Sequence, residues 1–148
     1  MRLTKNFRLS ELDCKDGSPV PHELYGNAQI LLERLQVIRD NYNMIYNLAD
    51  HTKIEYKIEI ISGYRTELHN KNCGGKKGSF HLACMAADMK VYYIKKRLLF
   101  KPKKVYVKPK RLYDLIESLI EYQHIQDGGL GKYKTFTHYD IRDVRARW

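Results

Sequence analysis

Apolar residues recur every three or four positions in the first third of the chain. Leu24, Leu31, Leu35 and Ile38 follow this spacing, which places their side chains on one side of an α-helix. We therefore predict a helix over residues 23–41 whose apolar side packs against a core.

A second amphipathic helix is predicted over residues 110–123. Leu112, Leu115 and Leu119 repeat the same spacing, and the glycines of residues 127–131 follow soon afterwards. Because glycine is common just after the last turn of a helix, we expect these glycines to close the helix and form a turn.

Two stretches alternate between apolar and polar residues with a period of two, which is typical of strands with one buried face. In residues 54–60, isoleucine or tyrosine alternates with glutamate or lysine. Residues 86–93 show a similar alternation, and we expect a last strand over residues 135–142. Since helices and strands follow one another without a repeated unit, we predict an α+β domain with a small, mostly antiparallel sheet and helices packed on it.

The composition excludes several classes of protein. Hydrophobic residues make up 43% of the chain and charged residues 30%, which is typical of a globular protein rather than a disordered one. The length of 148 residues suits one domain, which we place at residues 1–148. The cysteines, Cys14, Cys73 and Cys84, are too sparse for a disulfide scaffold. We expect no membrane span and no signal peptide, because no apolar run is long enough.

The positive charge is concentrated in one segment. The net charge is +10, and residues 90–111 hold ten Lys or Arg and no acid. Pro102 and Pro109 favour a projecting loop or hairpin over a helix there. We predict a basic insertion that can be shortened without unfolding the domain. A solvated loop, or contact with an anionic wall polymer, is expected in preference to nucleic-acid binding.

Two histidines lie in settings that suit a metal ion. His81 follows a polar, glycine-rich stretch and precedes Asp88, so a bend between them could bring both to one ion. His138 lies on the last predicted strand, and Asp140 at i+2 points to the same face. Two histidines and a carboxylate are a common ligand set of catalytic zinc. Spacing alone does not distinguish this set from ordinary polar residues at the end of a sheet.

Several sequence blocks, taken in order, resemble a known family. The blocks are Ser62 to Arg65 (SGYR), Ser79 to Asp88 (SFHLACMAAD), Gly128 to Gly131 (GGLG) and Phe136 to Arg142 (FTHYDIR). They are similar to the zinc D-alanyl-D-alanine peptidase family, which includes wall-cutting carboxypeptidases, phage endopeptidases and fold relatives of the Hedgehog signalling domain. The likeness extends to the opening residues 3–7 and the final Arg147-Trp148, and leaves out the basic segment.

The resemblance implies the Hedgehog-like α+β fold and specific roles for site residues. It implies a zinc ion with three ligands, His81, Asp88 and His138. Arg65 would hold a substrate carboxylate, or the carbonyl oxygen that becomes negative during attack, which suits a guanidinium group. Ser79 would contact the substrate backbone. Independently of the resemblance, we expect Tyr64 and Tyr133 to flank the site, with Tyr64 among the residues that bind substrate.

Two positions depart from the family pattern. The family usually has glycine three residues after the first ligand, where this chain has Cys84; we expect a small buried residue rather than a thiol that competes for the metal. Better-known members place a glutamate three residues before the last histidine as general base, and this chain has Thr135 there. Asp140 is then the candidate catalytic proton carrier; an equally weighted alternative is that it orients His138.

These residues lead to an expectation of function. We predict a zinc-dependent peptidoglycan peptidase that hydrolyses stem-peptide bonds next to D-amino acids, as an endolysin-type endopeptidase or a D,D-carboxypeptidase. The alternative is a catalytically inert zinc-fold module that binds the wall or belongs to a virion, and the missing glutamate supports it. We expect a monomer. It would be made in the host cytoplasm and released to the cell wall, or it would belong to a phage particle.

Overall fold

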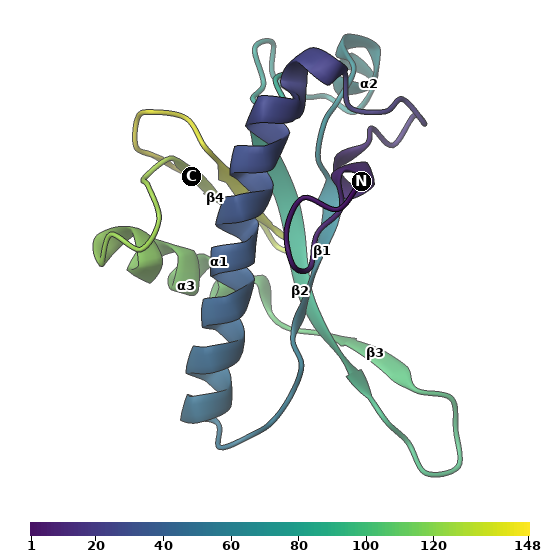
Figure 1. Cartoon of the computed structure of the whole chain (residues 1–148), viewed down its shortest axis with the longest axis vertical. Helices are drawn as coiled ribbons and strands as arrows, with labels where there is room; N and C mark the ends of the chain where they lie inside the picture. Colours follow the sequence, from purple (N-terminus) through teal and green to yellow (C-terminus); the bar gives the residue numbers. More distant parts are fainter.

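One sheet with two of the three helices against one of its faces forms the protein, in a computed structural model that describes residues 1–148 (Figure 1). The strands are β1 (Lys57–Ser62), β2 (Ala86–Lys95), β3 (Lys103–Tyr106), β4 (Gly129–Lys132), β5 (Thr137–Asp140) and β6 (Ala146–Arg147). They lie in the order β1-β2-β5-β4-β6, and β3 pairs with β2. Only β4 and β6 run parallel. The predicted α+β fold with a mostly antiparallel sheet is confirmed.

The helices are α1 (Tyr25–Ala49), α2 (Glu67–Asn72) and α3 (Pro109–Glu121), with 3₁₀ turns at Leu9–Leu12 and His22–Leu24. Helix α1 runs along the sheet, with α3 beside it (Figure 1). Leu31, Leu35 and Ile116 on these helices are fully buried with Met89 and Tyr139 of the sheet, so the core lies between the helices and this face. None of the helices combines the length and apolarity needed to cross a bilayer.

The predicted boundaries at the end of the first helix and the start of the first strand were wrong, and both errors have one cause. Helix α1 continues to Ala49 instead of ending at 41, and β1 begins at Lys57 instead of 54. Asn43 exchanges two hydrogen bonds with the backbone of Tyr56, at 2.8 and 3.0 Å, and Asn47 does the same with Ile54, both at 2.7 Å. The helix therefore binds the backbone of residues 54–56, which no neighbouring strand pairs.

Two short elements were missed in the glycine-rich stretches. The predicted turn at 127–131 contains strand β4, where a Cβ on Gly129 would collide with the carboxylate of Asp140, and a Cβ on Gly131 would lie 2.6 Å from the Trp148 ring. These glycines allow close approach rather than form a turn. Helix α2 lies in the first glycine-rich stretch, where the Thr66 hydroxyl accepts a hydrogen bond from the His69 amide and caps the helix.

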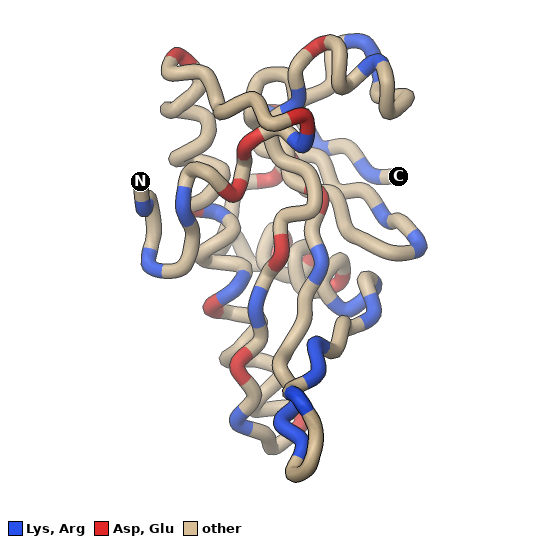
Figure 2. The backbone as a smooth tube through the Cα atoms, turned by 90° about the vertical axis from the view of Figure 1, so that its right-hand side faces the viewer, with Lys and Arg blue, Asp and Glu red and all other residues tan.

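The basic segment forms a hairpin of which only the outer part projects. Strand β2 continues to Lys95, where it pairs with Lys103 of β3, and the hairpin extends away from the sheet (Figure 1). Val91 is buried, and Pro109 begins α3, so the predicted insertion over residues 90–111 is too wide. Residues 96–102 are the part outside regular structure. Lys and Arg gather along this hairpin, at the bottom of Figure 2.

Candidate metal centre

Alternation along two paired strands separates core residues from polar ones. On β2, Ala87 and Met89 face the core, and Asp88 between them faces the opposite side of the sheet. On β5, Tyr139 belongs to the core, and His138 lies directly opposite Asp88 in the strand register. The pairing of β2 with β5 therefore places a carboxylate and an imidazole together, on the face away from α1 and α3.

His81 reaches this pair from the turns that precede β2. Its Nδ1 donates a hydrogen bond of 2.6 Å to the carbonyl oxygen of Gly63, which leaves Nε2 with a free lone pair. That Nε2 lies 3.4 Å from Oδ2 of Asp88. A side chain at Gly63 would place its Cβ 2.7 Å from the Cα of Leu12. Glycine is therefore required where the backbone orients the imidazole.

The geometry and the chemistry of these residues fit a metal ion. His81, Asp88 and His138 are buried, and each offers a ligand atom within 4.8 Å of the others. Nδ1 of His138 lies 2.8 Å from Oδ1 of Asp88. Nitrogen and carboxylate donors of this kind suit zinc.

Asp140 binds the side of His138 that faces away from Asp88. Its Oδ2 accepts a hydrogen bond of 2.9 Å from Nε2 of His138. The same carboxylate accepts two bonds from the Arg142 guanidinium, at 2.7 and 2.6 Å, one of 3.3 Å from the Arg142 amide and one of 3.1 Å from the Gly129 amide. Asp140 is fully buried. Such a carboxylate fixes the tautomer and orientation of a ligating imidazole.

Opposite charges set the ionisation of these groups. Burial alone would raise the pKa of Asp88, but hydrogen bonds from His138 and His81 outweigh it and hold that pKa well below its usual range. Burial acts in the same direction on Asp140, where hydrogen bonds from Arg142 and His138 bring the pKa well below its usual range. Burial would lower the pKa of His138, and hydrogen bonds to Asp140 and Asp88 raise it instead.

The three residues predicted to bind substrate are placed differently. Arg65 and Ser79 both line a cavity of about 710 Å³ that contains the three candidate ligands. Arg65 donates to Oδ2 of Asp88 at 2.8 Å and to the Ser62 hydroxyl at 2.9 Å. Tyr64 is not among the residues that line this cavity, and it packs against the core.

Aromatic and cationic side chains form the walls of the cavity. The Trp148 ring lies 5.1 Å from the His138 ring, and its indole N–H donates to the Tyr133 hydroxyl. The guanidinium of Arg142 lies over the Phe80 ring at 4.3 Å. Sequence reasoning missed Arg142 as a partner of the centre, although its i+2 spacing from Asp140 places it on the same face. A second missed contribution is the Gly63 carbonyl, which no sequence pattern indicates.

The two departures from the family pattern have clear positions. Cys84 is fully buried in the core with a φ of 53°, a left-handed conformation that favours glycine. Burial raises the pKa of its thiol to about 12, so the thiol stays protonated. Thr135 is exposed between β4 and β5 and does not line the cavity.

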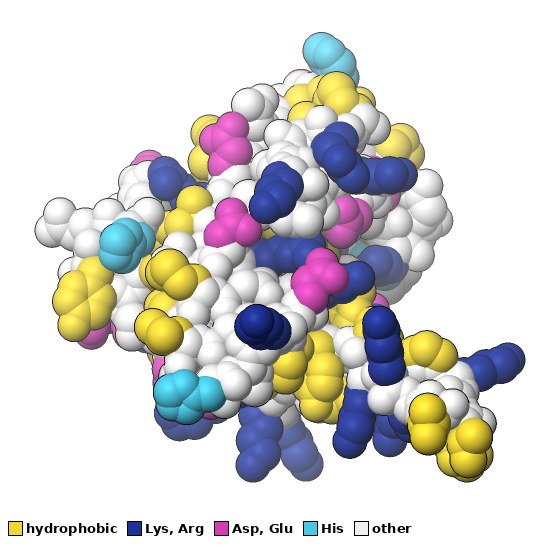
Figure 3. Space-filling model, turned by 60° about the horizontal axis from the view of Figure 1, so that its bottom comes forward, with side chains coloured by type: hydrophobic (Ala, Val, Ile, Leu, Met, Phe, Trp, Pro, Cys, Tyr) yellow, Lys and Arg dark blue, Asp and Glu magenta, His cyan; other side chains and the backbone are white.

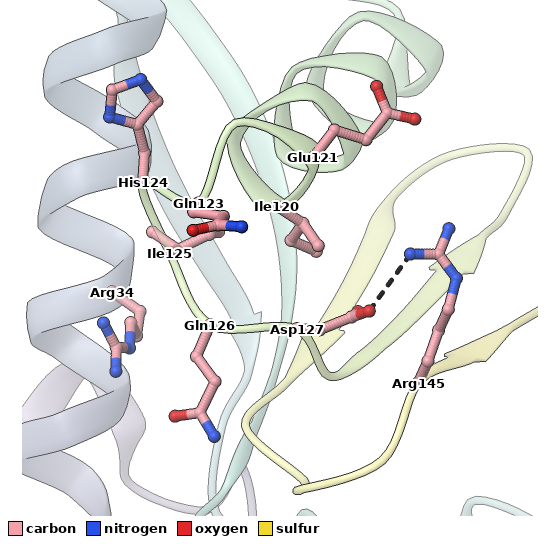
Figure 4. Close-up of a pocket in the computed structure, with 9 residues that line it drawn as sticks. All are labelled: Arg34, Ile120, Glu121, Gln123, His124, Ile125, Gln126, Asp127 and Arg145. Carbon is pink, nitrogen blue, oxygen red and sulfur yellow. Dashed lines mark hydrogen bonds and ion pairs between the residues drawn. The ribbon is translucent and has the colours of Figure 1, made fainter.

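Two other features of the structure do not resemble this centre. Cys14, Asp16 and His69 also lie close enough for a metal ion, but the exposed Asp16 already accepts hydrogen bonds from Thr66 and from the Ser18 amide. A second pocket, of about 400 Å³, lies between α1 and the connection from α3 to β4 (Figure 4). It contains an ion pair of 3.1 Å between Asp127 and Arg145 and none of the predicted site residues.

Comparison with known proteins agrees with the geometry. Residues 5–140 match the family model described as Peptidase M15, and this range contains every candidate ligand. Comparisons with curated proteins and with solved structures give no significant match. The M15 family consists of zinc enzymes, and the resemblance drawn from the sequence blocks is confirmed. The chain belongs to the M15 family of zinc D-Ala-D-Ala peptidases.

Proposed function

We propose that the protein is a zinc-dependent peptidase that hydrolyses stem-peptide bonds of peptidoglycan next to D-amino acids. The observation that carries this proposal is the buried group of His81, Asp88 and His138 at one cavity, with Asp140 and Gly63 holding the two imidazoles. In this proposal those three residues hold the zinc ion. When bound, zinc supplies Lewis acidity, which polarises a carbonyl group and makes water acidic enough to attack it.

The charge of the cavity favours a substrate with carboxylates. Lys76 and Lys77 line the cavity and form no ion pair with an acid of the chain. Arg65 lies at the cavity too, with a side chain 15% exposed. Stem peptides carry free carboxylates, which such groups bind through charge-assisted hydrogen bonds. We assign Arg65 to the substrate carboxylate or carbonyl oxygen and Ser79 to the substrate backbone.

The contacts of Asp140 favour a positioning role over proton transfer. Every hydrogen bond that its carboxylate accepts comes from His138, Arg142 or the Gly129 amide, and no part of it is exposed. A general base must reach the reacting proton, which this packing prevents. We propose that Asp140 orients His138.

A second candidate function follows from the same observation. Asp88 and Asp140 have the only side-chain carboxylates that line the cavity, and both are hydrogen-bonded to other groups. With Thr135 at the usual glutamate position, no side-chain carboxylate at the centre is free to act as general base. This favours an inert module of the same fold that binds the wall or belongs to a virion.

Digestion of purified peptidoglycan separates the two functions. We expect soluble muropeptides from the wild type, identified by mass spectrometry, and none after metal chelation; re-addition of zinc should restore them. His124→Ala, at an exposed position outside the cavity, is the matched control for His81→Ala. A wild type that binds zinc and wall but releases no peptide would establish the inert module instead.

A further inference from the structure

Three apolar side chains at the end of the hairpin lie outside the hydrophobic core. Leu98 is 99% exposed, Leu99 83% and Phe100 69%. They are consecutive, so they form one patch at the part of the molecule that projects farthest from the sheet (Figure 1). Contiguous exposed apolar patches with a polar rim mark interaction sites for proteins or membranes.

Cations surround this tip on both arms of the hairpin. Lys95, Lys96 and Arg97 precede the three apolar residues, and Lys101 and Lys103 follow them. None of these five forms an ion pair with an acid. In Figure 3, the projecting part at the lower right carries hydrophobic side chains at its end and Lys and Arg side chains beside them.

Internal contacts give the arm a defined shape. Arg97 donates two hydrogen bonds, of 3.0 and 2.8 Å, to the carbonyl oxygen of Lys101, which closes the loop beneath the apolar residues. At the base, Glu59 of β1 accepts from Lys104 at 2.8 Å and from the Tyr106 hydroxyl at 2.7 Å. The tip is therefore presented on a paired strand ribbon that is tied to the sheet.

We propose that the tip of the hairpin docks on the surface of an anionic lipid bilayer, with residues 98–100 inserted among the lipids and the flanking cations on the headgroups. A wall polymer or a nucleic acid also offers phosphates, but neither offers an apolar phase for two leucines and a phenylalanine. Apolar insertion together with cation binding is the usual basis of peripheral membrane attachment. This proposal does not depend on the chemistry of the metal centre.

Docking would set the height of the candidate metal centre above the lipid. Asp88 lies near the start of β2, and the tip follows its end. Because a strand rises about 3.3 Å per residue, the centre would stand on the order of 25 Å from the bilayer. An enzyme held in this way would act on peptides outside the lipid rather than on the lipid itself.

Vesicle flotation with the full-length protein tests the proposal. We expect binding to vesicles of phosphatidylcholine with phosphatidylglycerol, weakened by salt, and little binding to phosphatidylcholine alone. The combined change Leu98→Ser, Leu99→Ser and Phe100→Ser should weaken binding about tenfold or more. Leu68→Ser with Val144→Ser removes similarly exposed apolar residues, 69% and 66% exposed, and should bind as the wild type does.

A second pair of variants isolates the role of the cations. Lys95→Gln, Lys96→Gln and Lys101→Gln together should weaken binding to the anionic vesicles. Lys5→Gln, Lys15→Gln and Lys53→Gln remove the same net charge from exposed positions elsewhere and should have a much smaller effect. Equal loss in both sets would mean that net charge alone drives binding, and would overturn docking by the hairpin.

Insertion itself has a direct readout. Phe100→Trp in a Trp148→Phe background leaves one tryptophan, whose emission should shift to the blue on anionic vesicles and be quenched by brominated lipid. Thermal unfolding of each variant checks that the fold is kept. The absence of a blue shift on anionic vesicles would overturn the proposal. So would a protein that binds teichoic acid or DNA but not vesicles, with binding unchanged in the serine variant, and this result would assign the surface to a polymer.

Discussion

The candidate metal centre and the hairpin use charged residues in opposite ways. At the centre, Asp88 and Asp140 are buried, and each is hydrogen-bonded to an imidazole and a guanidinium. On the outer hairpin, residues 95–103, the cations are exposed and pair with no acid. The net charge of +10 therefore reflects exposed cations such as those of the hairpin and carries no information about the chemistry of the centre.

The two regions differ in the free-energy cost of removing one charged side chain. A buried charge that loses its partner remains in a low-dielectric environment, so its loss of solvation is no longer offset. An exposed lysine is already hydrated, and removing it changes stability little. Substitutions should therefore have large effects on stability and zinc content at the centre and small effects on stability on the hairpin.

The largest effect is expected from the loss of a candidate ligand. His81→Ala should reduce the zinc content from about one ion per chain to a small fraction, because the remaining donors do not complete a tight site. Metal analysis after dialysis measures this. Its control, His124→Ala, should keep the zinc. Full zinc retention in His81→Ala would show that the ion binds elsewhere.

A change at Asp140 tests whether it positions His138. Asp140→Asn should weaken zinc affinity by about 10- to 100-fold, and excess zinc should restore activity. Asp143→Asn, at an exposed position close by, should change neither. Competition with a chelating dye gives the affinity. If zinc affinity is unchanged and turnover falls about 100-fold, Asp140 is the proton carrier.

A smaller effect is expected at Glu117, which pairs with Arg147 at 2.6 Å and with Arg145 at 2.5 Å. The hydrogen bond from Arg147 lowers the pKa of Glu117, so the stabilisation is present above the pKa of the unfolded chain and is lost as the pH falls. Glu117→Gln should reduce the free energy of unfolding by about 1 kcal/mol at neutral pH.

Denaturant unfolding at two pH values checks the sign of that effect. The difference between wild type and Glu117→Gln should shrink at about pH 3, below the ordinary glutamate pKa. Glu121→Gln changes an exposed glutamate of the same helix without an ion pair and should have little effect at either pH. A difference that grows on acidification would show that the carboxylate does not stabilise the fold in its charged form.

The smallest effect on stability is expected from shortening the hairpin. Lys95 and Lys103 are partners in the strand register, so an Asn-Gly turn can replace residues 96–102. Stability should change by less than about 1 kcal/mol, and zinc content should stay the same. Thermal unfolding and metal analysis measure both. If the shortened protein no longer unfolds cooperatively, the tip contributes to the core.

Local patterns predicted the elements that bury an apolar face. The spacing of Leu31 and Leu35 gives the middle of α1, and the alternation around Asp88 gives most of β2, because hydrophobic burial has the period of the local backbone. The i+2 spacing of His138 and Asp140 predicts their common face for the same reason. The ligand set itself came from the resemblance of ordered blocks to a family and stays a prediction until metal is measured.

Contacts between distant residues decided the rest. Asn43 and Asn47 set where α1 ends and β1 begins, Gly63 orients His81, and Arg142 and Gly129 hold Asp140. Each contact joins a polar group to a partner that is chosen by chain path and strand register rather than by its neighbours in sequence. The sequence by itself therefore determined which faces are apolar, where the charge lies and which family the chain resembles. Only the tertiary structure decided how the polar groups pair, because a buried hydrogen bond depends on which atoms the fold brings within reach.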